Sequence, residues 1–322
     1  MSPLPTRAEI EAAAGLVTPV VPTTPHYSWP LLNAAAGCEL WVKHENHTQL
    51  GAFKVRGGLV YLDALRRREP ACRGVIAATR GNHGQSVAFA ARRAGLAAVI
   101  VVPRGNSLEK NAAMRALGAT LVEHGEDFQA ALEHARGLAA ERGLHAVPSF
   151  APELVTGVAV SALDFLQNTP PLDTVYVPIG LGSGICAMLA ARAALGLDVK
   201  IVGVCAAEAP SIALSFAAGR VVPHPTTTRL ADGLACSTPN PDALDHIQHG
   251  VERMVRVSEA EIAAAMRLAF TAMHNVLEGA AAAGLAAVLQ ERPTIAGRRI
   301  GLVLTGGNVD AAVFARVLAG GA

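Results

Sequence analysis

The chain is 322 residues long, 51% of them hydrophobic, and its 27 basic and 26 acidic side chains give a formal net charge of +1. This balance excludes the large positive surface of a protein that binds nucleic acid or an anionic membrane. No apolar run reaches the roughly 18 residues that cross a bilayer. Residues 1–17 lack the apolar centre of a signal peptide, and the five cysteines form no CxxC pair. We therefore expect a cytoplasmic protein of about two domains.

From residue 54 onward, apolar segments of strand length alternate with segments of helix length. The expected strands of the first unit lie at 74–78, 97–102 and 119–124, and the helices at 81–95, 107–118 and 126–143. Strands that alternate with helices predict βαβ units and a parallel sheet that helices cover on both faces.

The same alternation restarts after a break at 148–152. The second unit is predicted to hold helices at 152–167, 185–196 and 258–273, strands at 174–179 and 200–206, a long loop at 221–233, and a last strand with a glycine turn at 299–308. Ser258 and Glu261 have the spacing of a capping box at the start of a helix. The chain therefore reads as two α/β units.

The first segment that can carry chemistry is LGAFKVRGG, which contains Lys54. A lysine that forms a Schiff base needs an accessible nitrogen in an otherwise dry pocket, which lowers its pKa. Phe53 could pack beside a bound ring, and the glycines would let the backbone approach it. A surface lysine at the start of a helix has the same local pattern, so this segment alone leaves both readings open.

The second segment is TRGNHGQS, residues 79–86, between an expected strand and an expected helix. Ligands of open α/β sheets bind outside the carboxyl ends of the strands, and the N-terminus of a helix favours an anion such as a carboxylate. Asn82 is a neutral donor for a phenolic or carbonyl oxygen. His83 fits a structural role as well as that of a base.

The third and fourth segments are VPIGLGSGI and LVLTGGN. The first has the strand, glycine loop and helix that hold a phosphate on backbone amides. Its spacing of Gly180, Gly182 and Gly184 is not that of a dinucleotide site, and the next strand, 200–206, has no acid at its end. A smaller phosphate compound fits better, although a nucleotide-dependent oxidoreductase is the alternative from the fold alone. Thr305 is expected to end the last strand.

Together these segments offer the contacts that pyridoxal 5'-phosphate (PLP) and an amino acid require. Over roughly residues 15–316, the chain resembles the fold-type-II PLP enzymes, in particular the serine/threonine dehydratases and serine racemase. The resemblance implies a tryptophan synthase β-like fold with two open, mostly parallel twisted-sheet domains and helices on both faces. Residues 1–58 and 151–322 would form the large PLP-binding domain, and residues 59–150 the small domain. The resemblance also suggests that the protein forms a homodimer.

The motifs of this family transfer to this chain residue by residue. LGAFKVRG resembles TGSFKxRG, so Lys54 would bind PLP covalently, next to Phe53. The segments that resemble the other family motifs imply that PLP contacts Asn82, Gly180, Leu181, Gly182, Ser183, Gly184, Glu278 and Thr305. The loop similar to SSGNHGQ would bind the substrate carboxylate through Thr79, Arg80, Gly81, Asn82 and His83.

The chain departs from the family at Leu50, Ala52 and Arg80, where the family has hydroxyl residues. In the racemase, the serine that corresponds to Arg80 is the acid/base on the ring face opposite the lysine. Arginine stays protonated and is a poor base, so racemisation is disfavoured. Arg80 could instead reinforce carboxylate binding or select an acidic or unusual side chain. The acids of the family's metal site do not map clearly, so no metal is predicted.

The implied activity is β-elimination from a 3-hydroxy amino acid such as L-threonine or L-serine, which yields a 2-keto acid and ammonia. Lys54 would remove the α-proton. Dehydration of 3-hydroxyaspartate or of a bulkier 3-hydroxy amino acid, and racemisation, are alternatives within the family. A β-replacement enzyme and a non-catalytic binding protein are weaker ones.

Overall fold

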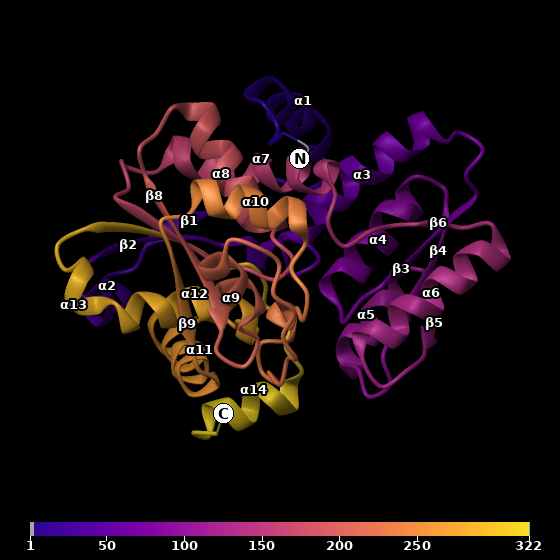
Figure 1. The fold of residues 1–322 in the computed structure, drawn as a ribbon. Coiled ribbons are helices and arrows are strands. Elements are labelled where there is room, and N and C mark those ends of the chain that lie inside the picture. Colours follow the sequence, from indigo (N-terminus) through magenta and orange to yellow (C-terminus); the bar gives the residue numbers. More distant parts are fainter. Residues whose placement is uncertain (1–2, 322) are drawn as a thin grey trace.

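The computed structural model describes residues 3–321, so residues 1, 2 and 322 of the predicted large domain lie outside it. Two sheets form the centre of the fold (Figure 1). The larger sheet has six strands, and only its first strand is antiparallel to its neighbour. In spatial order they are β1 (His26–Ser28), β2 (Glu39–Lys43), β10 (Arg299–Val303), β7 (Thr174–Pro178), β8 (Lys200–Ala206) and β9 (Arg253–Val257).

The smaller sheet has four parallel strands from residues 74–146. In spatial order they are β5 (Thr120–Glu123), β4 (Ala97–Val102), β3 (Gly74–Ala78) and β6 (His145–Ala146). The predicted α/β fold with two mostly parallel sheets is thus confirmed. The division into domains at residues 58 and 150 stays a prediction.

Helices cover both faces of each sheet, which explains why the central strands are continuous apolar runs. In β7, Val175 and Val177 point into one core, and Tyr176 points into the other. In β3, Val75 belongs to one core and Ile76 to another. The helices are α1 (Arg7–Val17), α2 (Pro30–Ala36), α3 (Lys54–Arg68), α4 (Asn82–Arg93), α5 (Leu108–Ala116), α6 (Phe128–Arg142), α7 (Pro152–Asn168), α8 (Ser183–Leu195), α9 (Ser211–Ala218), α10 (Pro241–Gly250), α11 (Glu259–Met273), α12 (Gly279–Gln290), α13 (Arg292–Ile295) and α14 (Ala311–Leu318), with short 3₁₀ helices at Glu45–His47 and Asp232–Leu234.

The predicted strands and helices agree with the structure to within about two residues at their ends. The capping box of Ser258 and Glu261 is formed at the start of α11. The last strand, β10, ends at Val303, so Thr305 lies just beyond it and not at its last position. The predicted loop at 221–233 also runs into a short 3₁₀ helix at its end. Among the described residues, no helix is long and apolar enough to cross a bilayer.

Helix α3 packs on both α4 and α7, so it lies between the two parts of the fold (Figure 1). Glycines allow this close packing. A Cβ added to Gly157 of α7 would lie 2.3 Å from the carbonyl oxygen of Arg56, and one added to Gly58 of α3 would lie 2.2 Å from Ser86 Oγ. Larger residues would push the helices apart and displace Lys54, the first residue of α3.

A buried ion pair fixes the start of α3. Arg56 donates from Nε to Glu45 Oε2 at 2.7 Å and from Nη2 to Glu45 Oε1 at 3.0 Å, and both side chains are only 1% exposed. Arg56 also donates to the carbonyls of Val21 and Pro22, and the Thr24 hydroxyl donates to Glu45 at 2.6 Å. This network connects the helix that carries Lys54 to the N-terminal segment.

We expect Glu45→Gln to destabilise the protein by about 3–5 kcal/mol, because the Arg56 charge would be left buried without its partner. The exposed pair of Arg7 and Glu11 provides a matched control, and Glu11→Gln should change the stability by at most about 0.5 kcal/mol. Urea unfolding measures both values. Equal unfolding midpoints for Glu45→Gln and wild-type protein would show that the buried pair does not stabilise the fold.

Candidate active site

A cavity of about 380 Å³ opens between the two sheets, where the chain leaves the carboxyl ends of β3, β7 and β10. This is where open α/β sheets bind their ligands. The structure places all of the site residues predicted from the sequence in the wall of this one cavity. They are Phe53, Lys54, Thr79, Arg80, Gly81, Asn82, His83, Gly180, Leu181, Gly182, Ser183, Gly184, Glu278 and Thr305. Their individual roles stay predictions.

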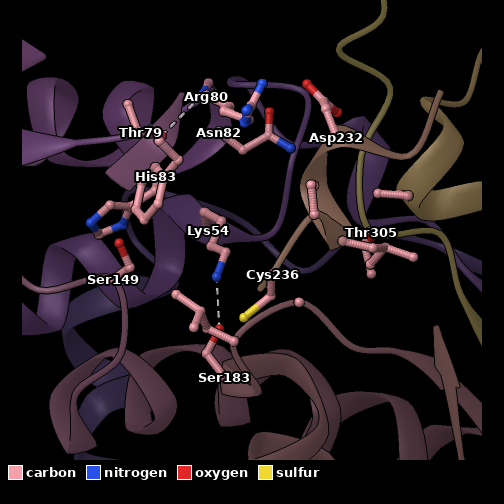
Figure 2. Close-up of a pocket in the computed structure, with 18 of the residues that line it drawn as sticks. Lys54, Thr79, Arg80, Asn82, His83, Ser149, Ser183, Asp232, Cys236 and Thr305 are labelled. Atoms are coloured by element: carbon pink, nitrogen blue, oxygen red, sulfur yellow. Dashed lines mark hydrogen bonds between the residues drawn. The ribbon is translucent and has the colours of Figure 1, made fainter. Parts of the chain in front are cut away.

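Lys54 projects into the middle of the cavity (Figure 2). Its Nζ donates to Ser183 Oγ at 2.8 Å and lies 5.0 Å from the centre of the Phe53 ring. Burial lowers the pKa of Lys54 to about 8, because the charged amine loses its hydration. A substantial fraction of the amine is therefore neutral near physiological pH, as a nucleophile requires.

Each of the other three lysines of the chain forms an ion pair with a carboxylate. Lys43 pairs with Asp164, Lys110 with Asp232 at 2.7 Å and Glu278 at 3.3 Å, and Lys200 with Glu252 at 2.9 Å. Lys54 alone has no carboxylate partner within residues 3–321. It is therefore the lysine that the structure leaves available to react.

The loop from Gly180 to Gly184 can receive a phosphate. It leads into α8, whose N-terminus has no capping side chain, so the first amides of the helix are free. Gly182 has a φ of +110°, and a Cβ there would lie 2.6 Å from Ala243 Cβ. A Cβ on Gly180 would lie 2.6 Å from the Gly233 carbonyl oxygen. The loop thus needs glycine at both positions.

The loop from Thr79 to His83 is held by its own hydroxyl. Thr79 Oγ1 accepts hydrogen bonds from the amides of Gly81 at 3.0 Å and Gly84 at 3.3 Å. The N-cap residue of α4, Gly81, has no side chain to cap the helix, and the amides of Asn82 and His83 have no partner in the described part of the chain. They offer two donors for a carboxylate.

Asn82 and His83 are neutral groups in this wall. The Asn82 side chain donates to Glu278 Oε1 at 2.7 Å and accepts from Asn308 at 2.9 Å, so its orientation is fixed. Burial, helped by the Lys54 charge, lowers the pKa of His83 to about 3. The His83 ring is therefore uncharged and does not attract a substrate carboxylate as a cation would.

Lys110 and Asp232 also line the cavity, and neither was predicted from the sequence. Lys110 comes from α5 and reaches across the cavity to Asp232 and Glu278. Burial lowers the pKa of Lys110, but the charges of Glu278 and Asp232 outweigh this and raise it, so Lys110 stays protonated. Asp232 lies in the segment LADGLA, residues 230–235, at the end of the loop predicted from the sequence. Nothing local distinguishes Lys110 from a surface lysine of its helix.

Comparison with known proteins assigns the chain to a family. The model of the family described as "Pyridoxal-phosphate dependent enzyme" matches residues 17–306. The chain belongs to this family. It is 34% identical over 289 residues to an L-threonine ammonia-lyase of Thermotoga maritima, covering 89% of this chain and 72% of that protein. It is 33% identical to an L-threo-3-hydroxyaspartate ammonia-lyase of a Pseudomonas species, covering 92% and 93%.

Solved structures agree with this assignment. The processed form of threonine deaminase isoform 2 from Solanum lycopersicum superposes with a TM-score of 0.89 at 29% identity, covering 96% of this chain and 90% of that one. A pyridoxal 5'-phosphate-dependent aspartate racemase gives a TM-score of 0.90 at 28% identity, covering 97% and 98%. The predicted family, fold and PLP cofactor are thereby confirmed.

The residues of the cavity fit PLP. An unpaired buried amine can bind its aldehyde, and the free amides of α8 can bind its phosphate. The Phe53 ring lies next to this loop, since a Cβ at Gly184 would be in ordinary van der Waals contact with it, at 3.7 Å. Within residues 3–321, no group of three or more His, Cys, Asp or Glu side chains could hold a metal ion.

The lowered pKa of Lys54 predicts how PLP-free protein takes up the cofactor. The rate at which added PLP develops visible absorbance should rise with pH and be half-maximal near the Lys54 pKa of about 8, because only the neutral amine attacks. Stopped-flow absorbance measures this rate. A rate that keeps rising through pH of about 10, as for an ordinary lysine, would contradict the effect of burial.

Proposed function

We propose that the protein is a PLP-dependent ammonia-lyase that eliminates the hydroxyl group of a 3-hydroxy amino acid and yields a 2-keto acid and ammonia. The observation that carries this proposal is Lys54, which has no carboxylate partner among the described residues and lies in a cavity with two loops that offer free amides. The names of the relatives support the same reaction class, since they include ammonia-lyases for L-threonine and for L-threo-3-hydroxyaspartate. These names leave the substrate open between the two.

Each wall of the cavity has a task in this reaction. The amides of Asn82 and His83 would bind the substrate carboxylate, and those of the Gly180–Gly184 loop the cofactor phosphate. Bound PLP withdraws electrons from Cα of the amino acid, which acidifies the α-hydrogen. Lys54 Nζ takes this proton, and its pKa of about 8 suits a base at neutral pH.

Elimination then breaks the bond between Cβ and the hydroxyl oxygen, which leaves as water. The enamine product hydrolyses to the keto acid and ammonia. The Thr305 side chain, which we propose faces the pyridine nitrogen, cannot supply a charge there. Without a charged partner for that nitrogen, fast elimination is favoured over long-lived carbanion chemistry.

The racemase alternative has less support. Racemisation needs an acid/base on each face of Cα, and Arg80 stands where the racemase has its second group. Arginine stays protonated in proteins. A nucleotide-dependent oxidoreductase has no support. Such an enzyme needs an acidic residue at the end of the strand that follows the glycine loop, and β8 ends without one.

We also propose the domain division given above, a homodimer and a cytoplasmic location. The division is supported by the sheets, since the four-stranded sheet takes its strands only from residues 74–146 and the larger sheet from both sides of that segment. In this division α3 starts in the large domain and continues in the small one.

The direct test is Lys54→Ala. We expect turnover of L-threonine, L-serine and 3-hydroxyaspartate to fall by about 1000-fold or more, because the base and the covalent attachment are lost together. Keto-acid release measures it. The control is Lys200→Ala, which removes a lysine paired with Glu252 on the surface and should keep wild-type turnover. Wild-type rates in Lys54→Ala protein would refute the mechanism.

A further inference from the structure

Arg80 is a cation of the cavity wall that has no anion. Its side chain makes no ion pair and no hydrogen bond with any described residue, and its Nε is buried without a partner. Lys110, by contrast, is held by the carboxylates of Asp232 and Glu278. A desolvated guanidinium nitrogen without a partner is costly, and an anion bound near Arg80 would offset this cost.

Neither anion of the proposed reaction so far requires Arg80. The cofactor phosphate has the Gly180–Gly184 loop, which contains Ser183. In Figure 2 Arg80 lies at the opposite end of the cavity from Ser183, beside Thr79 and Asn82. The α-carboxylate of any amino acid has the free amides at the start of α4. The side chain of the substrate could supply a third anion, for Arg80.

We propose that the preferred substrate is a 3-hydroxy dicarboxylic amino acid, 3-hydroxyaspartate, whose side-chain carboxylate binds to Arg80. This inference rests on the ammonia-lyase activity proposed above and specifies its substrate class. The planar guanidinium can bind a carboxylate through two parallel hydrogen bonds, which gives geometric as well as electrostatic selectivity. Lys110 is unavailable for this role because two carboxylates already bind it.

The reaction balances without an oxidant or reductant. The α-hydrogen leaves as a proton to Lys54, its electron pair forms the double bond between Cα and Cβ, and the bond between Cβ and the hydroxyl oxygen breaks. The proton and the departing hydroxide together make up the one water that is lost. The resulting enamine becomes an imine, and one water hydrolyses it to oxaloacetate and ammonia. The side-chain carboxylate bound by Arg80 is unchanged throughout.

The test compares two substrates in the PLP-loaded enzyme. We expect kcat/KM to be higher for one of the stereoisomers of 3-hydroxyaspartate than for L-serine. Arg80→Gln should lower the ratio of these two kcat/KM values by about 100-fold, because a buried charge-assisted contact is lost for one substrate only. Arg80→Lys should retain part of the ratio. The visible absorbance and melting temperature of each variant show that it is folded and loaded with PLP.

Arg104→Gln is the matched control. Arg104 follows β4, is largely exposed and pairs with Glu126, so its substitution removes the same charge outside the cavity and should leave the ratio unchanged. Two results would overturn the proposal. Wild-type enzyme could prefer L-serine or L-threonine to every stereoisomer of 3-hydroxyaspartate. Alternatively, Arg80→Gln could lower both kcat/KM values equally, which would assign Arg80 to the α-carboxylate.

A binding experiment separates this inference from the proposed activity. Succinate has two carboxylates and butyrate has one on a chain of the same length. Succinate should raise the melting temperature of the PLP-loaded enzyme more than butyrate does, and Arg80→Gln should remove this difference. If no 3-hydroxy amino acid is turned over, the ammonia-lyase proposal fails. The binding experiment alone then decides whether the cavity binds a dicarboxylate through Arg80. Equal shifts with succinate and butyrate would then overturn dicarboxylate binding.

Discussion

The loss of hydration at Lys54 without a compensating carboxylate is the constraint on which the rest of the site depends. A buried amine of this kind becomes neutral more easily, and burial lowers its pKa to about 8. The protein pairs the amines of Lys43, Lys110 and Lys200 with carboxylates and leaves this one with a neutral hydroxyl, Ser183. Lys54 is thus reactive because the fold leaves its amine without an ion pair.

The architecture maintains this condition. Lys54 is the first residue of α3, and the buried pair of Arg56 and Glu45 fixes the beginning of that helix. Close contacts at Gly58 and Gly157 bring α3 against α4 and α7, so the amine, the carboxylate loop and the phosphate loop face one cavity. Much of the stability of this region therefore serves to place a single amine and the free amides around it.

The sequence predicted the parts of the site that are local in the chain. Strand, glycine turn and helix are adjacent in sequence, so hydrophobic periodicity and glycine spacing located the loops at 79–83 and 180–184. The pairing of Lys110 with Asp232 joins residues 122 positions apart, and no local pattern records it. Thr305 was placed at a strand end because its segment is apolar, but pairing in β10 stops at Val303. Likewise, the sequence could not predict that Arg80 has no ion pair, because this depends on where carboxylates from distant parts of the chain lie.

The most direct test of this account is to find which lysine carries the cofactor. The chain has four lysines, so reduction of the PLP-loaded protein with borohydride, followed by digestion and mass spectrometry, has four possible outcomes. We expect a pyridoxyl group on Lys54 alone, because the other three amines are paired with carboxylates. Modification of Lys110, the other lysine of the cavity, with Lys54 unmodified would contradict it.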